Sequence, residues 1–463
     1  MNSKHENAPY PPDTLGMDAQ EMRRLGYAVV DAVIQRLENK HSEPAIAAAE
    51  PGPLLEILGG ALPEEAYPTD ESLDLLINSA LFHQQHGDHP RYFARIPGPS
   101  SFAAIIGEWI GVGFNSIAAS WPGGSGPSAV ELVVIDWLRQ LMGLPKNTEG
   151  VLVSGGSQAS LTAIAAVRAL KGQGCVYLSD QTHASLLRAL RTLGFGEQDI
   201  RILESDGHYT MSAESVQDAI TKDKRRGLTP MMIIATAGST NTGAVDPINL
   251  LADICAEYDV WLHVDGAYGA PAALTKSGKL SLEGIQRADS LTLDPHKWLF
   301  QPYDVGCLLI RPGVLEPCFS MNPEYLKDVR GADNATNFRN RGFELTRRSR
   351  ALKLWFSFRS YGVAKFREAI DYSIALTEFA EQYLRENPDR WEIISPAQLG
   401  IICFALRGES AQEHERRAQS LSESGFACVT TTRLKDRTVL RLCIINPLTT
   451  QADITETIDR LGC

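Results

Sequence analysis

The amino-acid sequence predicts an α/β fold, with a mostly parallel sheet in a large domain and a smaller α+β domain after it. From about residue 128 onward, short apolar segments alternate with helical patterns, as in parallel sheets whose strands are buried on both faces. After Gly362 this alternation gives way to a long helical pattern, two strand candidates and a final helix. Hydrophobic residues make up 44% of the chain and charged residues 22%. This is the composition of a globular protein and excludes a mainly disordered one.

The individual elements follow from residue spacing. In the large domain, five apolar segments are typical of strands, at residues 151–153, 175–178, 231–236, 260–264 and 290–293. Ser128 and Glu131 have the spacing of a capping box, which predicts that a helix begins there. Strands of the smaller domain are expected at 401–406 and 437–445. Because ligands of open α/β sheets bind beyond the carboxyl ends of the strands, we expect the functional site at that edge.

Residues 1–90 have the pattern of an appended helical segment. Apolar residues recur at helical spacing from Met22 to Leu37 and from Leu73 to Leu81. A connector rich in proline and glycine lies between them at 44–68, and residues 1–14 have the composition of a flexible arm. Two helices without a sheet make a poor core. We therefore expect this segment to pack on a larger body such as another subunit.

Charge and cysteine content narrow the functional classes. Lys plus Arg number 44 and Asp plus Glu 56, a net charge of −12, so nucleic acid and membrane surfaces are disfavoured as partners. The eight cysteines never form a C-x-x-C pair, which disfavours zinc ribbons and favours reduced, mostly buried thiols. The N-terminus has no apolar run typical of a signal peptide, and the longest apolar stretch, 102–119, is interrupted by Glu108 and Asn115. A cytoplasmic protein is expected.

Two of four polar motifs offer places for a phosphate and a cation. VLVSGGSQ places Gly155, Gly156 and Ser157 between a strand and a helix, where free N–H groups and the helix dipole suit a phosphate. HVDGAYG places Asp265 directly after a strand, where its carboxylate faces the ligand crevice and suits a positive charge. Taken alone, an ordinary turn and a loop-capping aspartate explain these motifs as well.

The other two motifs offer an amine and a flat imidazole. LTLDPHKWL places Lys297 beside Trp298, and a buried aromatic neighbour favours a lysine whose pKa is depressed by desolvation. SDQTHASLL places His183 just past another strand end. A surface lysine and a structural histidine are the ordinary explanations. Together, however, a phosphate cradle, an anion for a ring nitrogen, an amine for an imine and an imidazole to lie on a ring are the parts that pyridoxal phosphate requires.

A histidine cluster near residue 86 predicts no metal site. His83, His86 and His89 recur every three residues, but Gly87 and Pro90 interrupt a continuous helix, and no H-E-x-x-H pattern is present. No metal is expected.

These motifs resemble the group II pyridoxal-phosphate-dependent amino acid decarboxylases, the family of the aromatic-L-amino-acid, tryptophan, tyrosine and glutamate decarboxylases. The resemblance runs from HPRYFARIPGPSSF (89–102) through WLHVDGAYGA and LDPHKWL to LTRRSRALKLWFSFRSYG (345–362), and Asp265 and Lys297 are 297 − 265 = 32 residues apart, as in the family. It implies the fold type I of pyridoxal-phosphate enzymes (aspartate aminotransferase-like), with a mostly parallel seven-stranded sheet. It also implies a homodimer with shared active sites, each chain having a dimerisation segment (1–90), a large cofactor-binding domain (91–362) and a small C-terminal domain (363–463).

The resemblance also implies roles for individual residues. Lys297 would form the internal aldimine with pyridoxal 5'-phosphate, Asp265 would pair with the pyridinium nitrogen, and His183 would stack on the ring near the substrate carboxylate. The residues implied to hold the phosphate or its surroundings are Gly156, Ser157, Thr240, Asp294 and His296. Many relatives carry Asn in place of Asp294, and a carboxylate there repels a phosphate unless it is protonated or turned away. The implied reaction is decarboxylation of an L-amino acid to the amine, through an external aldimine and a quinonoid.

Phe338 occupies the position at which aromatic decarboxylases of this family carry a catalytic tyrosine, on a mobile loop supplied by the neighbouring subunit. Counting back from Arg347 and forward from Tyr325 gives the same position, and no tyrosine lies between Tyr325 and Tyr361. A phenyl ring has no proton to donate. In plant relatives, Phe at this place accompanies aldehyde synthases, which lose the amine as ammonia. The amine is the favoured product, with the loop register displaced by one residue or with His183 or water as the proton donor. The aldehyde is the alternative.

The substrate is less clearly indicated. The resemblance places Arg95, Ile96, Pro97, Ile117 and Ala119 along the substrate pocket. The small Ala119 leaves room for a large side chain and favours an aromatic amino acid, whereas Arg95 keeps an acidic substrate open, and a diamino acid is a further alternative. An aminotransferase or a desulfurase would need an arginine clamp in the small domain or a mobile cysteine. A non-catalytic binding protein is disfavoured because Lys297, Asp265 and His183 are all present.

Overall fold

The computed structural model describes residues 15–321 and 335–463. The predicted arm at 1–14 and Tyr325, which was one end of the count to Phe338, lie outside the described residues. The chain divides into two compact units, residues 1–44 and 45–463. The first unit contains helix α1 (Ala19–Asn39), as its periodicity predicts, and a 3₁₀ turn (Lys40–Ser42). The division of the chain at residues 90 and 362 stays a prediction.

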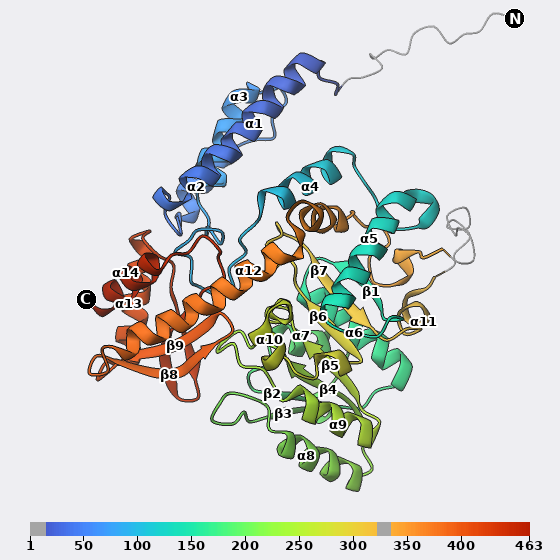
Figure 1. Ribbon diagram of the computed structural model, residues 1–463. Helices are drawn as coiled ribbons and strands as arrows, with labels where there is room; N and C mark the ends of the chain where they lie inside the picture. Colours follow the sequence, from blue (N-terminus) through green and yellow to red (C-terminus); the bar gives the residue numbers. More distant parts are fainter. Residues whose placement is uncertain (1–14, 322–334) are drawn as a thin grey trace, which may run out of the picture. The chain divides into compact units, whose positions relative to one another are not determined.

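The second unit contains the large sheet, which confirms the prediction of a mostly parallel, seven-stranded sheet (Figure 1). Its strand order is β1-β7-β6-β5-β4-β2-β3. Strand β7 is antiparallel to both of its neighbours, and the remaining pairs are parallel. The strands are β1 (Glu149–Val153), β2 (Cys175–Ser179), β3 (Ile200–Leu203), β4 (Pro230–Thr236), β5 (Trp261–Asp265), β6 (Ser290–Leu293) and β7 (Gly306–Ile310). All five predicted strands are present, and β3 and β7 are additional.

Helices pack along this sheet, and strands β2, β5, β6 and β7 are buried throughout. Helix α6 contacts β1, β5, β6 and β7, helix α5 contacts β1 and β7, and helices α8 and α9 cover β3, β4 and β5. Continuous burial of this kind means that both faces of the sheet are covered. The helices of this part are α4 (Phe102–Gly113), α5 (Trp121–Leu141), α6 (Gly156–Lys171), α7 (Ala184–Thr192), α8 (Ala213–Arg225), α9 (Ile248–Tyr258), α10 (Lys276–Ser281) and α11 (Leu315–Phe319).

The predicted capping box at Ser128 is wrong. Helix α5 already begins at Trp121, where the side chain of Ser120 accepts a hydrogen bond from the N–H of Gly123, and its one interruption, at Gly124, also comes before Ser128. Glu131 is buried and accepts hydrogen bonds from the backbone N–H of Leu152 and from Arg347. The glutamate therefore serves tertiary packing and does not cap a helix.

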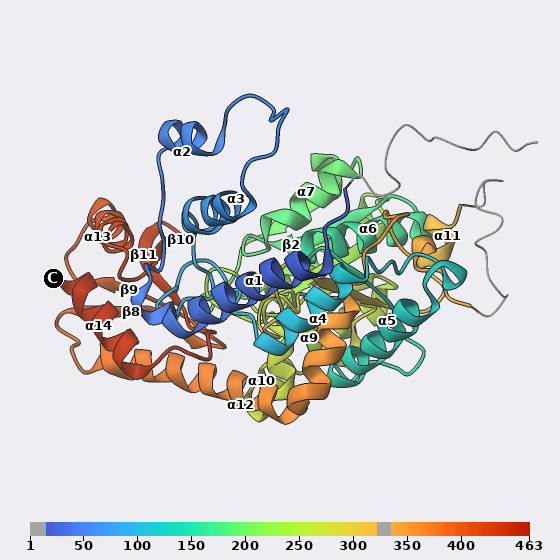
Figure 2. The same ribbon diagram turned by 90° about the horizontal axis from the view of Figure 1, so that it is seen from above.

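The C-terminal part is a four-stranded antiparallel sheet with the order β10-β11-β9-β8, covered by helices, as predicted for a small α+β domain. Helix α12 (Ala351–Arg385) contacts α4 and α5 of the large domain as well as β8, β9 and α14, and Figure 2 shows it extending along both parts. It bends at Gly362, whose φ of 70° is left-handed and favours glycine. The other elements are β8 (Trp391–Gln398), β9 (Ile401–Leu406), α13 (Ala411–Glu423), β10 (Thr430–Leu434), β11 (Arg437–Cys443) and α14 (Gln451–Gly462).

The segment before the large domain contains more helix than predicted. The connector at 44–68 includes helix α2 (Pro51–Leu58), which begins at a proline because its fixed φ and missing N–H suit the first turn. Helix α3 (Thr69–Leu75) continues into a π-helical turn (Leu76–Ala80), in agreement with the predicted helix. All eight cysteines have free thiols, six of them buried, as expected. Within residues 15–321 and 335–463, no helix has the length and apolar character needed to cross a membrane.

Candidate functional site

The sequence motifs meet at one edge of the large sheet because the strands that precede them are aligned. Strands β2, β4, β5 and β6 are parallel, so their carboxyl ends lie together. Val153 at the end of β1 pairs with Gly306 at the start of the antiparallel β7, which brings the glycine turn to the same edge. The sheet thus places His183, the 237–245 loop, Asp265 and Lys297 at a common edge, as the sequence predicts.

Lys297 and Asp294 form a close ion pair at this edge. Their Nζ and Oδ2 atoms are 3.0 Å apart, and the Asp294 side chain is only 3% exposed. The Nε2 atom of His296 lies 3.6 Å from the same Oδ2, and its Nδ1 accepts a hydrogen bond from the N–H of Val305. The Oδ1 atom of Asp294 is buried and has no hydrogen-bond partner within the described part of the chain.

This ion pair reverses the predicted pKa shift of Lys297. Burial lowers the pKa of the amine, as expected beside the buried Trp298, but the carboxylates of Asp294 and Asp265 outweigh burial and raise it overall. The prediction of a depressed pKa is therefore wrong for the chain by itself. Lys297 is therefore held as a cation in the chain by itself.

Asp265 and His183 lie within electrostatic reach of Lys297. Asp265 is buried, its Oδ1 accepts a hydrogen bond from the N–H of Ala267, and burial raises its pKa while the charge of Lys297 opposes this. The His183 ring bonds Ser185 at the start of α7, with 2.7 Å between Nδ1 and Oγ. Partial desolvation lowers the pKa of His183, although much of the residue is open to solvent, and the carboxylate of Asp265 opposes this.

The glycine turn forms a cradle without side chains. A Cβ atom on Gly155 would lie 3.1 Å from Cε1 of His296, and one on Gly156 would lie 3.0 Å from Oδ2 of Asp294. Helix α6 begins at Gly156, and the first N–H groups of a helix have no partner within the helix. Ser157 follows in the first turn and is exposed. The turn therefore presents bare N–H groups beside Asp294, His296 and Lys297, which suits an anionic group.

Thr240 lies in the loop that follows β4, and this loop is tied to the small domain. The backbone carbonyl of Thr240 accepts a hydrogen bond from Nε of Arg441 on β11. Arg441 is 3% exposed, and its two terminal nitrogens have no hydrogen-bond partner among the residues that the structure describes. Arg441 was not predicted from the sequence, and it is an arginine of the small domain of the kind that the aminotransferase alternative requires.

Phe338 packs against two arginines in the structure of the single chain. It begins a 3₁₀ turn (Phe338–Asn340), is fully buried, and its ring centroid lies 5.1 Å from the guanidinium carbon of Arg347 and 5.7 Å from that of Arg341. Within residues 15–321 and 335–463, no hydrogen bond, ion pair or ring contact joins it to Lys297. The ring is packed as a core residue.

Tyr303 is a further residue of the candidate site that was not predicted from the sequence. It lies in the loop between β6 and β7, its ring centroid is 5.0 Å from that of His296, and 61% of the residue is exposed. A Cβ atom on Gly98 would overlap its hydroxyl group, so the phenol lies directly over that glycine. Nothing in the sequence marks a tyrosine six residues after Lys297, because only the fold of the loop brings it back over His296.

The predicted substrate-pocket positions differ in exposure. Arg95 is exposed and donates a hydrogen bond to Gln85, with 3.0 Å between Nη1 and Oε1. Ile117 is 37% exposed, whereas Ala119 is 8% exposed and its carbonyl accepts a hydrogen bond from the N–H of Arg339. Ile96 is half-buried and Pro97 is buried.

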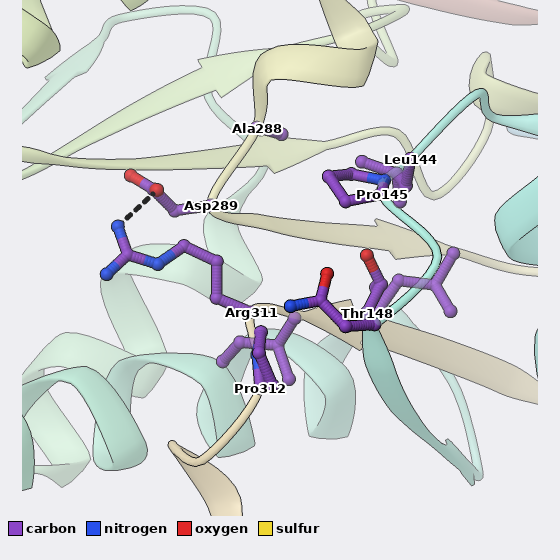
Figure 3. A pocket seen from close by; sticks show the side chains of 10 residues that line it. Leu144, Pro145, Thr148, Ala288, Asp289, Arg311 and Pro312 are labelled. Atoms are coloured by element: carbon purple, nitrogen blue, oxygen red, sulfur yellow. Dashed lines mark hydrogen bonds and ion pairs between the residues drawn. The ribbon is translucent and has the colours of Figure 1, made fainter.

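The opposite edge of the sheet carries a separate hollow of about 320 Å³ (Figure 3). It lies between the end of β7 and the starts of β1 and β6, where Arg311 and Asp289 form an ion pair with 2.8 Å between Nη1 and Oδ1. Its other lining residues are Leu144, Pro145, Asn147, Thr148, Ala288, Leu309, Ile310 and Pro312. It contains none of the predicted site residues. No group of three or more metal-ligating side chains gathers anywhere in the described residues, the predicted histidine cluster included.

The chain is similar in sequence and in structure to proteins of one known family. Residues 51–407 match the model of the pyridoxal-dependent decarboxylase conserved domain. The aromatic-L-amino-acid decarboxylase of Bacillus atrophaeus is 44% identical over 457 residues, which cover 96% of this chain and 95% of the relative. The phenylacetaldehyde synthase of Arabidopsis thaliana is 30% identical over 465 residues, 95% of each chain. A crystal structure of Oryza sativa TDC with PLP and tryptamine superimposes with a TM-score of 0.91 at 28% identity and covers 98% of both chains.

Proposed function

Because the chain belongs to the pyridoxal-dependent decarboxylase family, we propose that it converts an aromatic L-amino acid to the corresponding amine and carbon dioxide. The family, its fold type I and its cofactor, pyridoxal 5'-phosphate, agree with the sequence predictions. The observation that carries the choice of substrate is the 44% identity, over nearly the whole chain, to an aromatic-L-amino-acid decarboxylase.

The residues at the sheet edge fit the cofactor. The glycine turn at the start of α6 offers N–H groups and space for a phosphate, Lys297 offers an amine, and the buried Asp265 offers a carboxylate for a cationic ring nitrogen. Asp294 directs one oxygen to Lys297 and leaves the other without a partner within the described residues. When bound, the cofactor supplies an aldehyde that bonds an amine and a ring that accepts the electrons left on the substrate Cα.

We infer the following roles for this chain's own residues. Lys297 would hold the cofactor through its Nζ atom until the substrate amine takes its place. Asp265 would keep the ring nitrogen protonated, since its buried carboxylate is stabilised by a nearby cation. His183 would help to hold the cofactor ring and would orient the substrate carboxylate. The residues that hold the phosphate and its surroundings are Gly156, Ser157, Thr240, Asp294 and His296.

A homodimer is part of the proposal. Helix α4 and the residue that follows it expose apolar side chains, with Ile110 47%, Val112 65% and Phe114 84% exposed. An exposed apolar surface of this kind favours a protein interface, and a second copy of this chain would cover it. Light scattering should give twice the mass of the chain. A cytoplasmic location and the absence of a nucleic-acid partner stay predictions.

A second candidate product is favoured by Phe338. A phenyl ring at this position removes the proton donor that a tyrosine provides, and a phenylacetaldehyde synthase is among the relatives. In that case the substrate would lose carbon dioxide and ammonia, and dioxygen would be reduced to hydrogen peroxide. Among residues 15–321 and 335–463, no contact favours an acidic or a diamino acid substrate.

Incubation of the purified, cofactor-loaded protein with each of the twenty amino acids under air tests the proposal. We expect carbon dioxide and an equal amount of amine from an aromatic amino acid, without peroxide. Aldehyde with matching ammonia and peroxide would establish the second candidate instead. Formation of a keto acid or sulfide without carbon dioxide would refute both, and it would point to the aminotransferase or desulfurase alternative.

A further inference from the structure

The proposed reaction needs a proton that Phe338 is unable to supply. Loss of carbon dioxide leaves an electron pair on the substrate Cα, and one proton delivered to that carbon completes the amine. Without that proton, the carbon reacts with dioxygen. One amino acid, one dioxygen and one water then give one aldehyde, one carbon dioxide, one ammonia and one hydrogen peroxide. The product therefore depends on whether a proton donor stands beside Cα.

The structure contains a phenol close to Lys297 on the same chain. The ring of Tyr303 packs on the His296 ring at 5.0 Å and 52°, and His296 and Lys297 both approach Oδ2 of Asp294, at 3.6 and 3.0 Å. The phenol is thus separated from the Lys297–Asp294 ion pair by a single ring. Much of the residue is open to solvent, with 61% exposed, while its hydroxyl group lies against Gly98.

The residues before and after Tyr303, Pro302 and Asp304, are both held by hydrogen bonds. The buried amine of Lys353 on α12 donates hydrogen bonds to the carbonyls of Pro302 (2.8 Å) and Asp304 (3.0 Å). Arg350 donates a hydrogen bond to the side chain of Asp304. Gly98 leaves room for the phenol, because any side chain there would overlap the hydroxyl. Because the residues on either side of Tyr303 are fixed by hydrogen bonds, Tyr303 itself has a defined position.

We propose that Tyr303 is the catalytic residue that delivers a proton from its hydroxyl group to the substrate Cα after carbon dioxide has left, in place of the tyrosine missing at position 338. The O–H bond of Tyr303 breaks, a C–H bond forms with the electron pair on Cα, and solvent returns a proton to the phenolate. No oxidant or reductant takes part. This inference rests on the proposed function and deepens it, since it assigns the step that separates amine from aldehyde.

The electrical surroundings of Tyr303 agree with this role. Partial desolvation raises the pKa of the phenol, the charge of Lys297 lowers it, and the carboxylates of Asp294 and Asp88 raise it. The hydroxyl therefore keeps its proton near neutral pH until a stronger base, such as a carbanion, stands beside it.

Replacement of Tyr303 with Phe tests the inference. Tyr258→Phe is the matched control, since Tyr258 ends α9 at the opposite edge of the sheet and contacts Lys224. The reaction is run under air in deuterium oxide with the aromatic substrate that releases carbon dioxide. We expect the unchanged protein and the control to give amine with one deuterium on Cα in a single configuration. Tyr303→Phe should form amine at least about a hundredfold more slowly and release aldehyde, ammonia and peroxide.

The stereochemistry separates catalysis from folding. A variant that is only less stable would lose rate but keep one configuration at Cα, whereas loss of the positioned donor also lets deuterium add from both faces. Unchanged amine output and configuration in Tyr303→Phe would overturn the inference. Formation of aldehyde alone by the protein without substitutions would also overturn the inference.

A measurement without cofactor keeps the inference separate from the proposed function. If the unchanged protein releases no carbon dioxide, the proposed function fails. In either case, the difference in tyrosinate absorbance between the cofactor-free protein and Tyr303→Phe reports the ionisation of this phenol. We expect ionisation above the ordinary value of about 10. Ionisation at that value would show that the phenol does not lie where the inference requires it.

Discussion

Replacement of Asp294 with asparagine tests how the charge of Lys297 is set. Burial by itself lowers the pKa of the Lys297 amine, but Asp294 and Asp265 outweigh burial and raise it. Only the neutral amine attacks an aldehyde. If Lys297 binds the cofactor as proposed, these carboxylates should slow its capture by the cofactor-free protein. Asparagine keeps the shape of Asp294 and still offers an oxygen to Lys297, while the negative charge is lost.

The size of the effect follows from the 3.0 Å between Nζ and Oδ2. Two unit charges at this distance attract by about 1.4 kcal/mol at the dielectric constant of water and by about 5.5 kcal/mol at an effective constant of about 20. Since the side chains of Lys297 and Asp294 are 24% and 3% exposed, the larger figure is the nearer one. Even the smaller figure corresponds to about a tenfold increase in the fraction of neutral amine. The substitution also removes a negative charge from the place where a phosphate is proposed to bind.

The assay follows the appearance of yellow colour when cofactor-free protein is mixed with pyridoxal phosphate at pH 7. We expect Asp294→Asn to take up the cofactor at least about tenfold faster than the unchanged protein. Asp253→Asn is the control, because it makes the same chemical change at an exposed ion pair with Arg287. If Asp294→Asn captures the cofactor at the unchanged rate or more slowly, Asp294 does not govern the charge of Lys297 and the reasoning is refuted.

Three further predictions concern buried charges and the loop. Arg347→Met strands the buried Glu131 carboxylate, now held at 2.7 Å, and should cost about 3–5 kcal/mol of stability. A lower urea midpoint that Glu131→Leu restores in the double variant would show it, and an unchanged midpoint would contradict it. Burial lowers the pKa of Lys353 to about 7, so the unfolded chain binds protons more strongly and stability falls as pH drops from about 10 to about 7. In Lys353→Met the melting temperature should depend less on pH over this range, and an equal slope would disprove the assignment. Phe338→Tyr should shift any aldehyde output toward amine, and an unchanged product ratio would show that residue 338 lies outside the site.

The main features of the sheet were predictable because buried strands have a simple signature. Segments such as 231–236 and 260–264 are apolar on both faces, since helices cover the sheet on both sides. Strand β3 was missed because its Arg201 interrupts a short edge strand that is only partly buried. The start of α5 was misplaced because a local pattern, Ser128 and Glu131, suggested a cap, while the glutamate in fact bonds Arg347 from a distant part of the chain.

The candidate site was predictable to the extent that it follows strand ends. Asp265 and Lys297 needed only the prediction that parallel strands finish at one edge. The ion pair of Asp294 with Lys297 was not predicted. The direction of a side chain within a turn depends on tertiary contacts, and the spacing of residues in the sequence does not show these. For the same reason Arg441 was missed, since it reaches the Thr240 loop from a strand of the other sheet.

The contrast between residues 338 and 303 shows why one position does not decide the product. Phe338 is buried against Arg347 and takes part in packing, so its lack of a hydroxyl removes one donor but says nothing of others. Tyr303 has a phenol one ring away from the Lys297–Asp294 ion pair, and Lys353 bonds the backbone carbonyls of the residues before and after it. If a phenol on either loop is able to protonate Cα, then aldehyde formation requires that both be absent. Two variants test this. Tyr303→Phe should favour aldehyde, because this chain already has Phe at position 338. In the double variant Tyr303→Phe, Phe338→Tyr, amine formation should return only if both side chains reach the same carbon.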